Sequence, residues 1–149
     1  LPHQTLVGDL DWFRENWGGR LIVKGILHPE DAFECRKIGV DAIVISNHGG
    51  RQLDEAPSAL EMLPRIRETV GLEYPLLVDG GLKHGGDIAL ALALGADFVL
   101  VGRAFMLSVA ALGQYGASYG MDILKAELKS TLLQLGCRSV SELPQFLKT

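Results

Sequence analysis

The chain has 149 residues, of which 48% are hydrophobic and 21% are charged, and its mean hydropathy is +0.20. These values are typical of one globular domain and exclude a disordered segment, which would bury too little apolar surface to offset chain entropy. The formal net charge of −4 argues against a nucleic-acid binder, since such proteins carry a basic surplus. Two cysteines without CxxC spacing, Cys35 and Cys137, predict free thiols in a reducing compartment.

Short apolar runs alternate with helical patterns along the chain. A helix over about Leu10–Trp17 comes first, and strands are predicted at Leu21–Val23, Ala42–Ile45, Leu76–Val78 and Phe98–Val101. Their residues are apolar at consecutive rather than alternating positions, which predicts strands buried on both faces of a parallel sheet. Proline in a first turn and glycine after a last turn delimit the later helices. These are predicted at Pro29–Ile38 (ended by Gly39), Ser58–Val70 (with Pro64 inside), Gly86–Leu94 (ended by Gly95), Ala104–Leu112 and Gly120–Leu135, before a helical turn in Ser139–Thr149.

This repetition of strand and helix predicts an α/β fold, either an open doubly wound sheet or half of an eight-stranded barrel. The doubly wound, dinucleotide-binding version is weakened because no GxGxxG motif follows the first strand. Every predicted strand ends in polar or glycine residues, and barrel enzymes carry their chemistry at the carboxyl ends of the strands. We therefore expect one functional rim, made by Lys24-Gly25, Ser46 to Arg51, Asp79-Gly80-Gly81 and Gly102-Arg103.

His48 and Arg51 follow the second strand and are separated by two glycines that let the loop fold back. An arginine offers a planar donor pair for a carboxylate, and a histidine accepts a proton near neutral pH. Together they suit proton abstraction next to a carboxylate. The simpler alternative is a surface ion pair between Arg51 and Asp54.

Lys24 ends an apolar strand, where an ammonium group is costly unless it meets an anion or an electron-rich ligand. The alternatives are that it extends to solvent or pairs with Asp79. After the third and fourth strands, glycines accompany the cations Lys83 and Arg103, as in phosphate sites of barrels. Asp79 suits ligand hydroxyls rather than a phosphate. His3, His28 and His84 lack metal-ligand spacing, so no metal site is expected.

The run Ser46-Asn47-His48-Gly49-Gly50-Arg51-Gln52-Leu53-Asp54 resembles the FMN-dependent α-hydroxy-acid oxidases and dehydrogenases, which include glycolate oxidase, lactate oxidase and the flavin-linked L-lactate and mandelate dehydrogenases. Val23-Lys24-Gly25, Asp79-Gly80-Gly81 and Gly102-Arg103 accompany it in the family's order. The family fold is an FMN-bearing TIM (β/α)8 barrel. The resemblance covers essentially residues 1–149 and implies its C-terminal half, with barrel strands 5 to 8 followed by C-terminal helices.

The resemblance implies a role for each of these residues. His48 would be the catalytic base at the substrate, and Arg51 would bind the substrate carboxylate. Lys24 would lie near the N1/O2 edge of the flavin and Ser46 would contact the ring. Asp79 would bind the ribityl chain, with the phosphate end held by Gly80, Gly81, Leu82, Lys83, Gly102 and Arg103. Lys83 departs from the family, which usually has arginine there, and keeps the charge but not the bidentate donor pair.

The family's first four strands supply further flavin contacts and the aspartate that orients the histidine. We therefore expect the chain to begin in the loop after strand four and to need an N-terminal half as partner. The expected reaction oxidises an L-2-hydroxy acid to a 2-oxo acid in a cytoplasmic homo-oligomer, with association to the inner membrane left open. One alternative is a non-catalytic, self-associating half-barrel that binds phosphate or flavin. Another is a different FMN or phosphate barrel, such as a purine-nucleotide or dihydroorotate dehydrogenase, against which the run from Ser46 to Arg51 argues.

Overall fold

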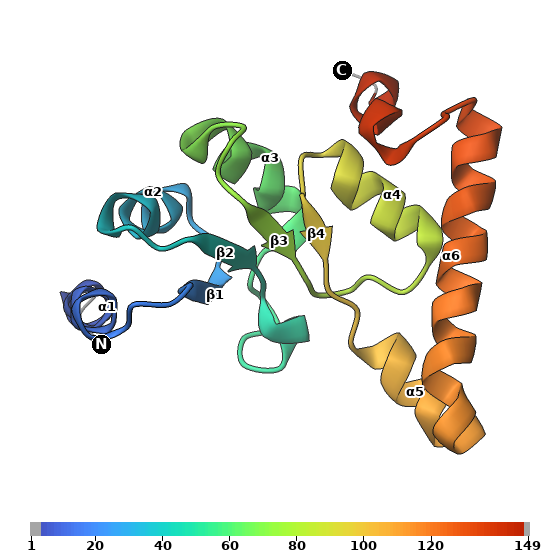
Figure 1. The fold of residues 1–149 in the computed structure, drawn as a ribbon, viewed down its shortest axis with the longest axis horizontal. Coiled ribbons are helices and arrows are strands. Elements are labelled where there is room, and N and C mark those ends of the chain that lie inside the picture. Colours follow the sequence, from blue (N-terminus) through green and yellow to red (C-terminus); the bar gives the residue numbers. More distant parts are fainter. Residues whose placement is uncertain (1–3, 148–149) are drawn as a thin grey trace.

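Four parallel strands form one sheet at the centre of the structure, a computed structural model that describes residues 4–147 (Figure 1). The strands lie in chain order across the sheet: β1 (Ile22–Ile26), β2 (Ala42–Ile45), β3 (Leu76–Val78) and β4 (Phe98–Val99). All three neighbouring pairs are parallel. This confirms the α/β fold with four parallel strands that the sequence predicts.

Helices connect and extend the strands. They are α1 (Gln4–Asn16), α2 (Pro29–Ile38), α3 (Ala59–Val70), α4 (Gly85–Ala93), α5 (Arg103–Leu112) and α6 (Gly116–Leu135), with short 3-10 segments η1 (His48–Gly50), η2 (Gly113–Tyr115) and η3 (Val140–Phe146). Helix α2 ends at Gly39 in the left-handed conformation, as predicted, and Ser58 caps α3 through its side chain. The predicted turn in Ser139–Thr149 is η3, and residues 148 and 149 lie outside the described range.

The largest differences from prediction are at element ends. Helix α1 begins six residues before Leu10, and α6 begins at Gly116 rather than Gly120. At Gly116 the backbones of α5 and α6 touch, since an added Cβ would lie 2.2 Å from the carbonyl oxygen of Ser108. The first α6 turn is therefore packed as well as helical. Strand β4 ends at Val99, although the N–H of Leu100 still donates to Val78 O at 2.8 Å.

The hydrophobic core lies between the central strands and helices α2 and α3. Its fully buried members include Ile43 and Ile45 of β2, Leu63 and Ile66 of α3, and Leu76 of β3. Cys35 and Cys137 are buried free thiols, as expected, and burial, with a smaller contribution from nearby Asp31, raises the pKa of Cys35 to about 11.

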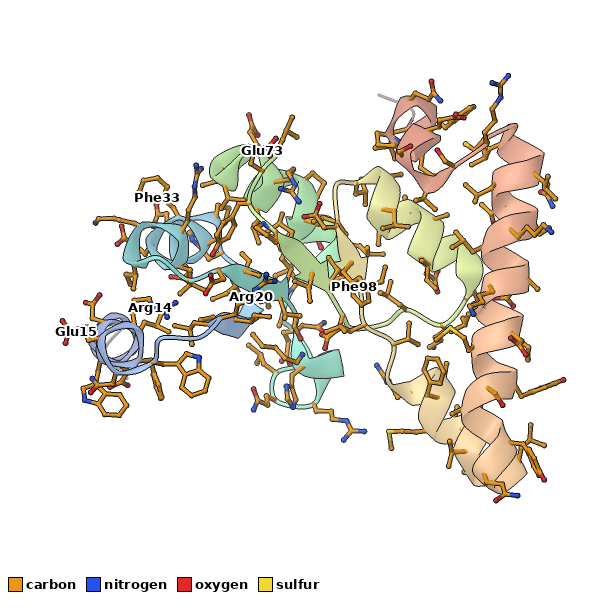
Figure 2. The ribbon with its side chains drawn as sticks, viewed as in Figure 1. Arg14, Glu15, Arg20, Phe33, Glu73 and Phe98 are labelled. Atoms are coloured by element: carbon orange, nitrogen blue, oxygen red, sulfur yellow. The ribbon has the colours of Figure 1, made fainter. Side chains whose placement is uncertain are left out.

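The prediction that all strands are buried on both faces is wrong for the two outer strands. Ile22 of β1 is 51% exposed and Phe98 of β4 is 59% exposed, whereas every residue of β2 is buried. Figure 2 labels Phe98 on its strand. The reason is topological: β1 and β4 are the edges of the sheet, and each pairs with one neighbour only.

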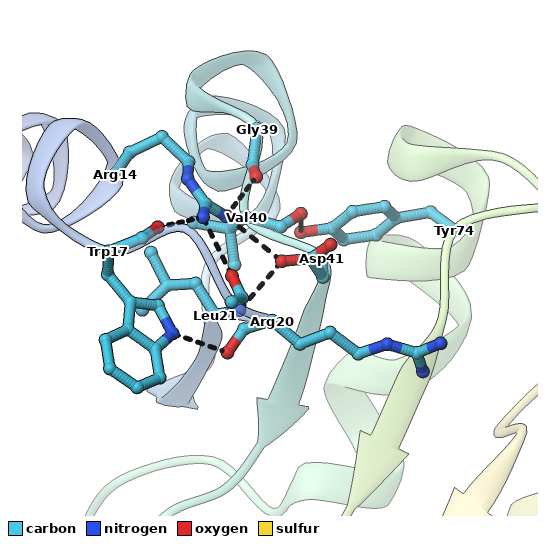
Figure 3. Close-up of polar contacts among 9 residues, drawn as sticks. Arg14, Trp17, Arg20, Leu21, Gly39, Val40, Asp41 and Tyr74 are labelled. Atoms are coloured by element: carbon cyan, nitrogen blue, oxygen red, sulfur yellow. Dashed lines mark hydrogen bonds and ion pairs between the residues drawn. The ribbon is translucent and has the colours of Figure 1, made fainter.

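Carboxylates anchor the amino ends of the strands. Asp41 accepts hydrogen bonds from the N–H of Leu21 at 2.7 Å and from Arg14 at 3.1 Å, which ties α1 to the sheet (Figure 3). Asp97 repeats the arrangement with the N–H of Leu76 at 2.8 Å and Arg67 at 2.7 Å. With this end fixed, the loops at the carboxyl ends are held on a rigid base.

Candidate active site

A cavity of about 250 Å³ opens at the carboxyl ends of the strands. Of the residues given a site role from the sequence, all but Ser46 line it: Lys24, His48, Arg51, Asp79, Gly80, Gly81, Leu82, Lys83, Gly102 and Arg103. Gly49, Leu100 and Met106 complete the lining. The four strand ends therefore meet around one shared space, as the parallel topology requires.

Lys24, Ser46 and Asp79 form a polar cluster that joins β1 to the ends of β2 and β3. The ammonium of Lys24 donates to Ser46 Oγ at 2.8 Å and forms an ion pair with Asp79 Oδ2. Ser46 is 2% exposed, so it lies behind the cavity wall and contacts the site through Lys24 and the N–H of His48. The pairing of Lys24 with Asp79, one of the alternatives weighed from the sequence, is thus present, and it keeps the positive charge at the cavity.

Asp79 has a second oxygen without a partner. Its Oδ1 is buried and accepts no hydrogen bond within the described residues. A buried carboxylate oxygen is stabilised by hydrogen-bond donors. Because no protein group in the described part of the chain donates to Oδ1, this oxygen favours a ligand that supplies a hydroxyl group.

His48 has the backbone conformation that places its side chain at the cavity. Its φ is +57°, the one positive value among the described non-glycine residues, which is costly for a residue with a Cβ. Two local hydrogen bonds hold this turn: the N–H of His48 donates to Ser46 Oγ at 3.0 Å, and that of Gly49 donates to Asn47 Oδ1 at 3.0 Å. Glycine follows at Gly49 and Gly50, both with positive φ.

Arg51 lines the cavity without an ion pair to any of the residues from 4 to 147. The alternative of a surface ion pair with Asp54 is therefore wrong, and the guanidinium remains available for an anion in the cavity. His48 and Arg51 are both exposed at its mouth.

The two glycine-rich loops differ in how their helices begin. At the start of α4, Asp87 Oδ2 accepts from the N–H groups of Lys83 at 2.8 Å and His84 at 3.0 Å. Helix α5 has no acidic residue in its first turn and no side-chain cap at Gly102. Its positive end, with the guanidinium of Arg103 beside it, therefore suits an anion better than the start of α4. In this structure Arg103 donates to Gly49 O at 3.3 Å.

Sequence reasoning gave no role to Asn47, which supports the cavity without lining it, or to Leu100 and Met106, which line it. Asn47 stands within the quoted run, and an asparagine two residues before glycine signals the side-chain turn that it forms with Gly49. Leu100 and Met106 give the cavity an apolar side, and nothing in their surroundings distinguishes them from core residues. Among residues 4–147, no group of three or more histidine, cysteine, aspartate or glutamate side chains could hold a metal ion.

A parallel α/β sheet with a polar, glycine-lined cavity at its carboxyl edge is the arrangement in which barrel enzymes place their active sites. The sequence profile of the family described as FMN-dependent dehydrogenase matches residues 2–149. The chain belongs to this family. FMN is the family's cofactor, which confirms the cofactor and the family predicted from the sequence.

The chain is also similar to individual proteins of this kind. The chain is 42% identical over 135 residues to an L-lactate dehydrogenase from Chromohalobacter salexigens, covering 91% of this chain and 34% of that protein. A soluble mutant of the membrane-associated (S)-mandelate dehydrogenase from Pseudomonas putida superposes with a TM-score of 0.90 at 43% identity, covering 95% of this chain and 40% of that one. A mandelate oxidase solved with (S)-4-hydroxymandelic acid superposes with a TM-score of 0.87 at 40% identity. That match covers 93% of this chain and 39% of the oxidase. The chain thus spans about a third of the length of that lactate dehydrogenase, and its fold corresponds to part of a TIM barrel.

The residues of the cavity fit FMN. Added Cβ atoms at Gly81 and Gly102 would meet nothing within 4 Å, so open space lies beside both glycines for a ligand to occupy. The unpartnered oxygen of Asp79 suits a ribityl hydroxyl, and Lys83 and Arg103 are cations that would suit a phosphate. No helix within residues 4–147 is both long and apolar enough to cross a membrane.

Proposed function

We propose that this chain carries the base, the carboxylate clamp and the phosphate site of an FMN-dependent enzyme that oxidises an L-2-hydroxy acid, of the lactate type, to its 2-oxo acid. Residues 1–149 would form the C-terminal half of the enzyme's domain, and an N-terminal half would complete it. The observation that carries the proposal is the single cavity that brings Lys24, His48, Arg51, Asp79 and Arg103 together.

Each side chain would act according to its chemistry. Arg51 would bind the substrate carboxylate through its unpaired guanidinium, which fixes the α-carbon beside His48. The imidazole of His48 would accept a proton, either from the 2-hydroxyl as the α-hydrogen leaves or from the α-carbon itself. When bound, FMN supplies the acceptor for the two electrons released from the α-carbon. Lys24 would balance the negative charge that follows, with Ser46 holding its ammonium group.

The phosphate end of the cofactor would lie across the loops after β3 and β4. Gly80, Gly81 and Leu82 would give backbone contacts, with Lys83 and Arg103 as the cations. Because Asp87 already occupies the N–H groups of Lys83 and His84, we place the main phosphate contact at Gly102 and Arg103, at the start of α5.

Two features support an incomplete site that needs a partner. The relatives extend well beyond the region that this chain matches. Both edge strands expose large apolar residues, Ile22 and Phe98, of the kind that a closed barrel buries. We propose an N-terminal half as that partner, assembly into a homo-oligomer, and a cytoplasmic protein. Because one relative is described as membrane-associated, peripheral attachment to the inner membrane is part of the proposal.

The experiment is anaerobic mixing of the protein, in its complete natural form and loaded with FMN, with L-lactate, glycolate and (S)-mandelate. Loss of the oxidised flavin absorbance with an L-2-hydroxy acid, and none with its D-enantiomer, supports the proposal. A protein that binds FMN but is reduced by none of these acids would be the non-catalytic binding half-barrel instead.

A further inference from the structure

The loop that borders the cavity after β3 is held from outside by a glutamate of the C-terminal helix. The carboxylate of Glu127, on α6, accepts a hydrogen bond from the N–H of Gly85 through Oε2 at 2.7 Å. Its other oxygen, Oε1, lies 3.7 Å from Nδ1 of His84. The loop and this glutamate are 42 residues apart in sequence, so the contact joins two separate parts of the chain.

The two backbones touch at this point. A Cβ added at Gly85 would lie 2.2 Å from the backbone nitrogen of Leu128 and 2.5 Å from the Cβ of Glu127. Figure 1 shows the amino end of α4 against the middle of α6. Only glycine fits between the helices, and this close approach is what brings the Gly85 N–H within reach of the carboxylate.

Three consecutive N–H groups are thereby fixed by two carboxylates. Asp87 accepts from Lys83 and His84, and Glu127 accepts from Gly85. The preceding residues, Gly80 to Lys83, line the cavity. A loop with several glycines has many accessible conformations, so an anchor at its far end decides where its cavity-facing part lies.

We propose that Glu127 is a positioning residue for the FMN phosphate. It does not contact the cofactor, and it fixes the end of the loop from Gly80 to Lys83, which would bind the phosphate group together with Gly102 and Arg103. This inference rests on the proposed function, since it takes that loop as a phosphate site. It assigns a cofactor-binding task to a helix that lies outside the cavity.

The test compares FMN with riboflavin, which has the same ring and ribityl chain and no phosphate. Both dissociation constants are measured by quenching of flavin fluorescence with the complete natural protein. In Glu127→Ala the dissociation constant for FMN should rise roughly ten-fold, since one charge-assisted hydrogen bond is lost, while that for riboflavin stays unchanged. Glu127→Gln, which retains an acceptor oxygen for the Gly85 N–H, should restore most of the FMN affinity.

Asp122→Ala is the matched control, because Asp122 is an exposed carboxylate of the same helix. It should change neither constant. Equal weakening of FMN and riboflavin in Glu127→Ala, or no weakening of either, would overturn the positioning role. If the alanine variant fails to fold, Glu127→Asp replaces it: the shorter side chain should weaken FMN alone, and any other pattern contradicts the proposal. An unmodified protein that binds neither flavin would overturn the proposed function itself, and this inference with it.

Discussion

His48, which we propose as the catalytic base, has a strained backbone. A non-glycine residue in the left-handed region costs on the order of 1–3 kcal/mol, and such strain persists only where the surroundings enforce it. Here Ser46 and Asn47 provide that enforcement through side-chain acceptors for two successive N–H groups. The strain sets where the imidazole lies, which is the requirement for a base that must meet a bound substrate.

For His48→Ala we expect FMN to stay bound and its reduction by a 2-hydroxy acid to slow by about 10²–10⁴-fold, the usual contribution of a general base. Stopped-flow absorbance of the FMN-loaded protein measures both properties. His28→Asn is the control, because His28 caps α2 away from the cavity and asparagine keeps a capping side chain. Reduction of the His48 variant at the parental rate would show that another group takes the proton.

Asp41 makes stability depend on pH. The N–H of Leu21, with a smaller contribution from Arg14, holds the pKa of Asp41 below its ordinary value of 3.8. Because the pKa of Asp41 is lower in the folded state than in the unfolded state, the carboxylate stabilises the protein at pH values above the unfolded-state pKa. This stabilisation is lost as the pH falls through the folded-state pKa. Asp41→Asn should therefore lower the free energy of unfolding at pH 6, with the difference from the unchanged protein shrinking below about pH 4.

Urea unfolding at a series of pH values measures this difference, with Asp11→Asn, an exposed carboxylate of α1, as the control. A pH-independent loss in Asp41→Asn would mean that the carboxylate acts through shape rather than charge.

Most of the cavity lining was predictable because polar residues that end parallel strands must meet at one edge. Arg51 and Asp79 are examples. The sequence could not indicate that Ser46 would be buried behind Lys24, or that Met106 would turn one side chain to the cavity, since both depend on how neighbouring strands and helices pack.

At the scale of elements, the amino end of the sheet is built twice in the same way. In each case an arginine near the end of a helix reaches the glycine that ends a later helix and an aspartate that precedes a strand: Arg14 with Gly39 and Asp41, and Arg67 with Gly95 and Asp97. The similarity of Gly39-Val40-Asp41-Ala42 to Gly95-Ala96-Asp97-Phe98, visible in the sequence, thus has a structural counterpart. The arginines that complete each unit were not predictable, because they lie some 27 to 30 residues earlier.

The two units should contribute unequally to stability. The Arg67 side chain is 10% exposed and also donates to the carbonyl oxygens of Gly71 and Tyr74, whereas that of Arg14 is 25% exposed. Arg67→Met should therefore cost about 3 kcal/mol, since it leaves buried acceptors unpaired, and Arg14→Met about 1 kcal/mol. Urea unfolding of both variants measures the two losses in the free energy of unfolding. Equal losses would contradict the claim that the more buried arginine contributes more to stability.

The ends of elements were the least predictable part of the fold. Helix α6 extends to Gly116 because a glycine there lets it lie against α5, a tertiary effect that local preference does not include. The core of each helix and each strand was predictable, since proline, glycine and apolar runs act locally.

At the scale of the whole molecule, the sheet is open at both sides. Ile22 at one edge and Phe98 at the other expose apolar surface, and strand edges left unpaired are prone to association. Four apolar strands alone predict a sheet but not its edges, whereas the resemblance to half of a barrel implies that the first and last strands are the edges. The cavity is bounded by the carboxyl ends of the four strands, and the open sheet leaves it accessible elsewhere, which fits a site that a further set of strands would close.

The most direct measurement is a crystal structure of the complete natural protein with FMN and a bound 2-oxo acid. The account predicts the phosphate at Gly102 and Arg103, a ribityl hydroxyl donating to the free oxygen of Asp79, and the acid's carboxylate against Arg51 with its 2-oxygen near His48. A flavin bound at another surface, or an acid that leaves Arg51 and His48 untouched, would contradict it.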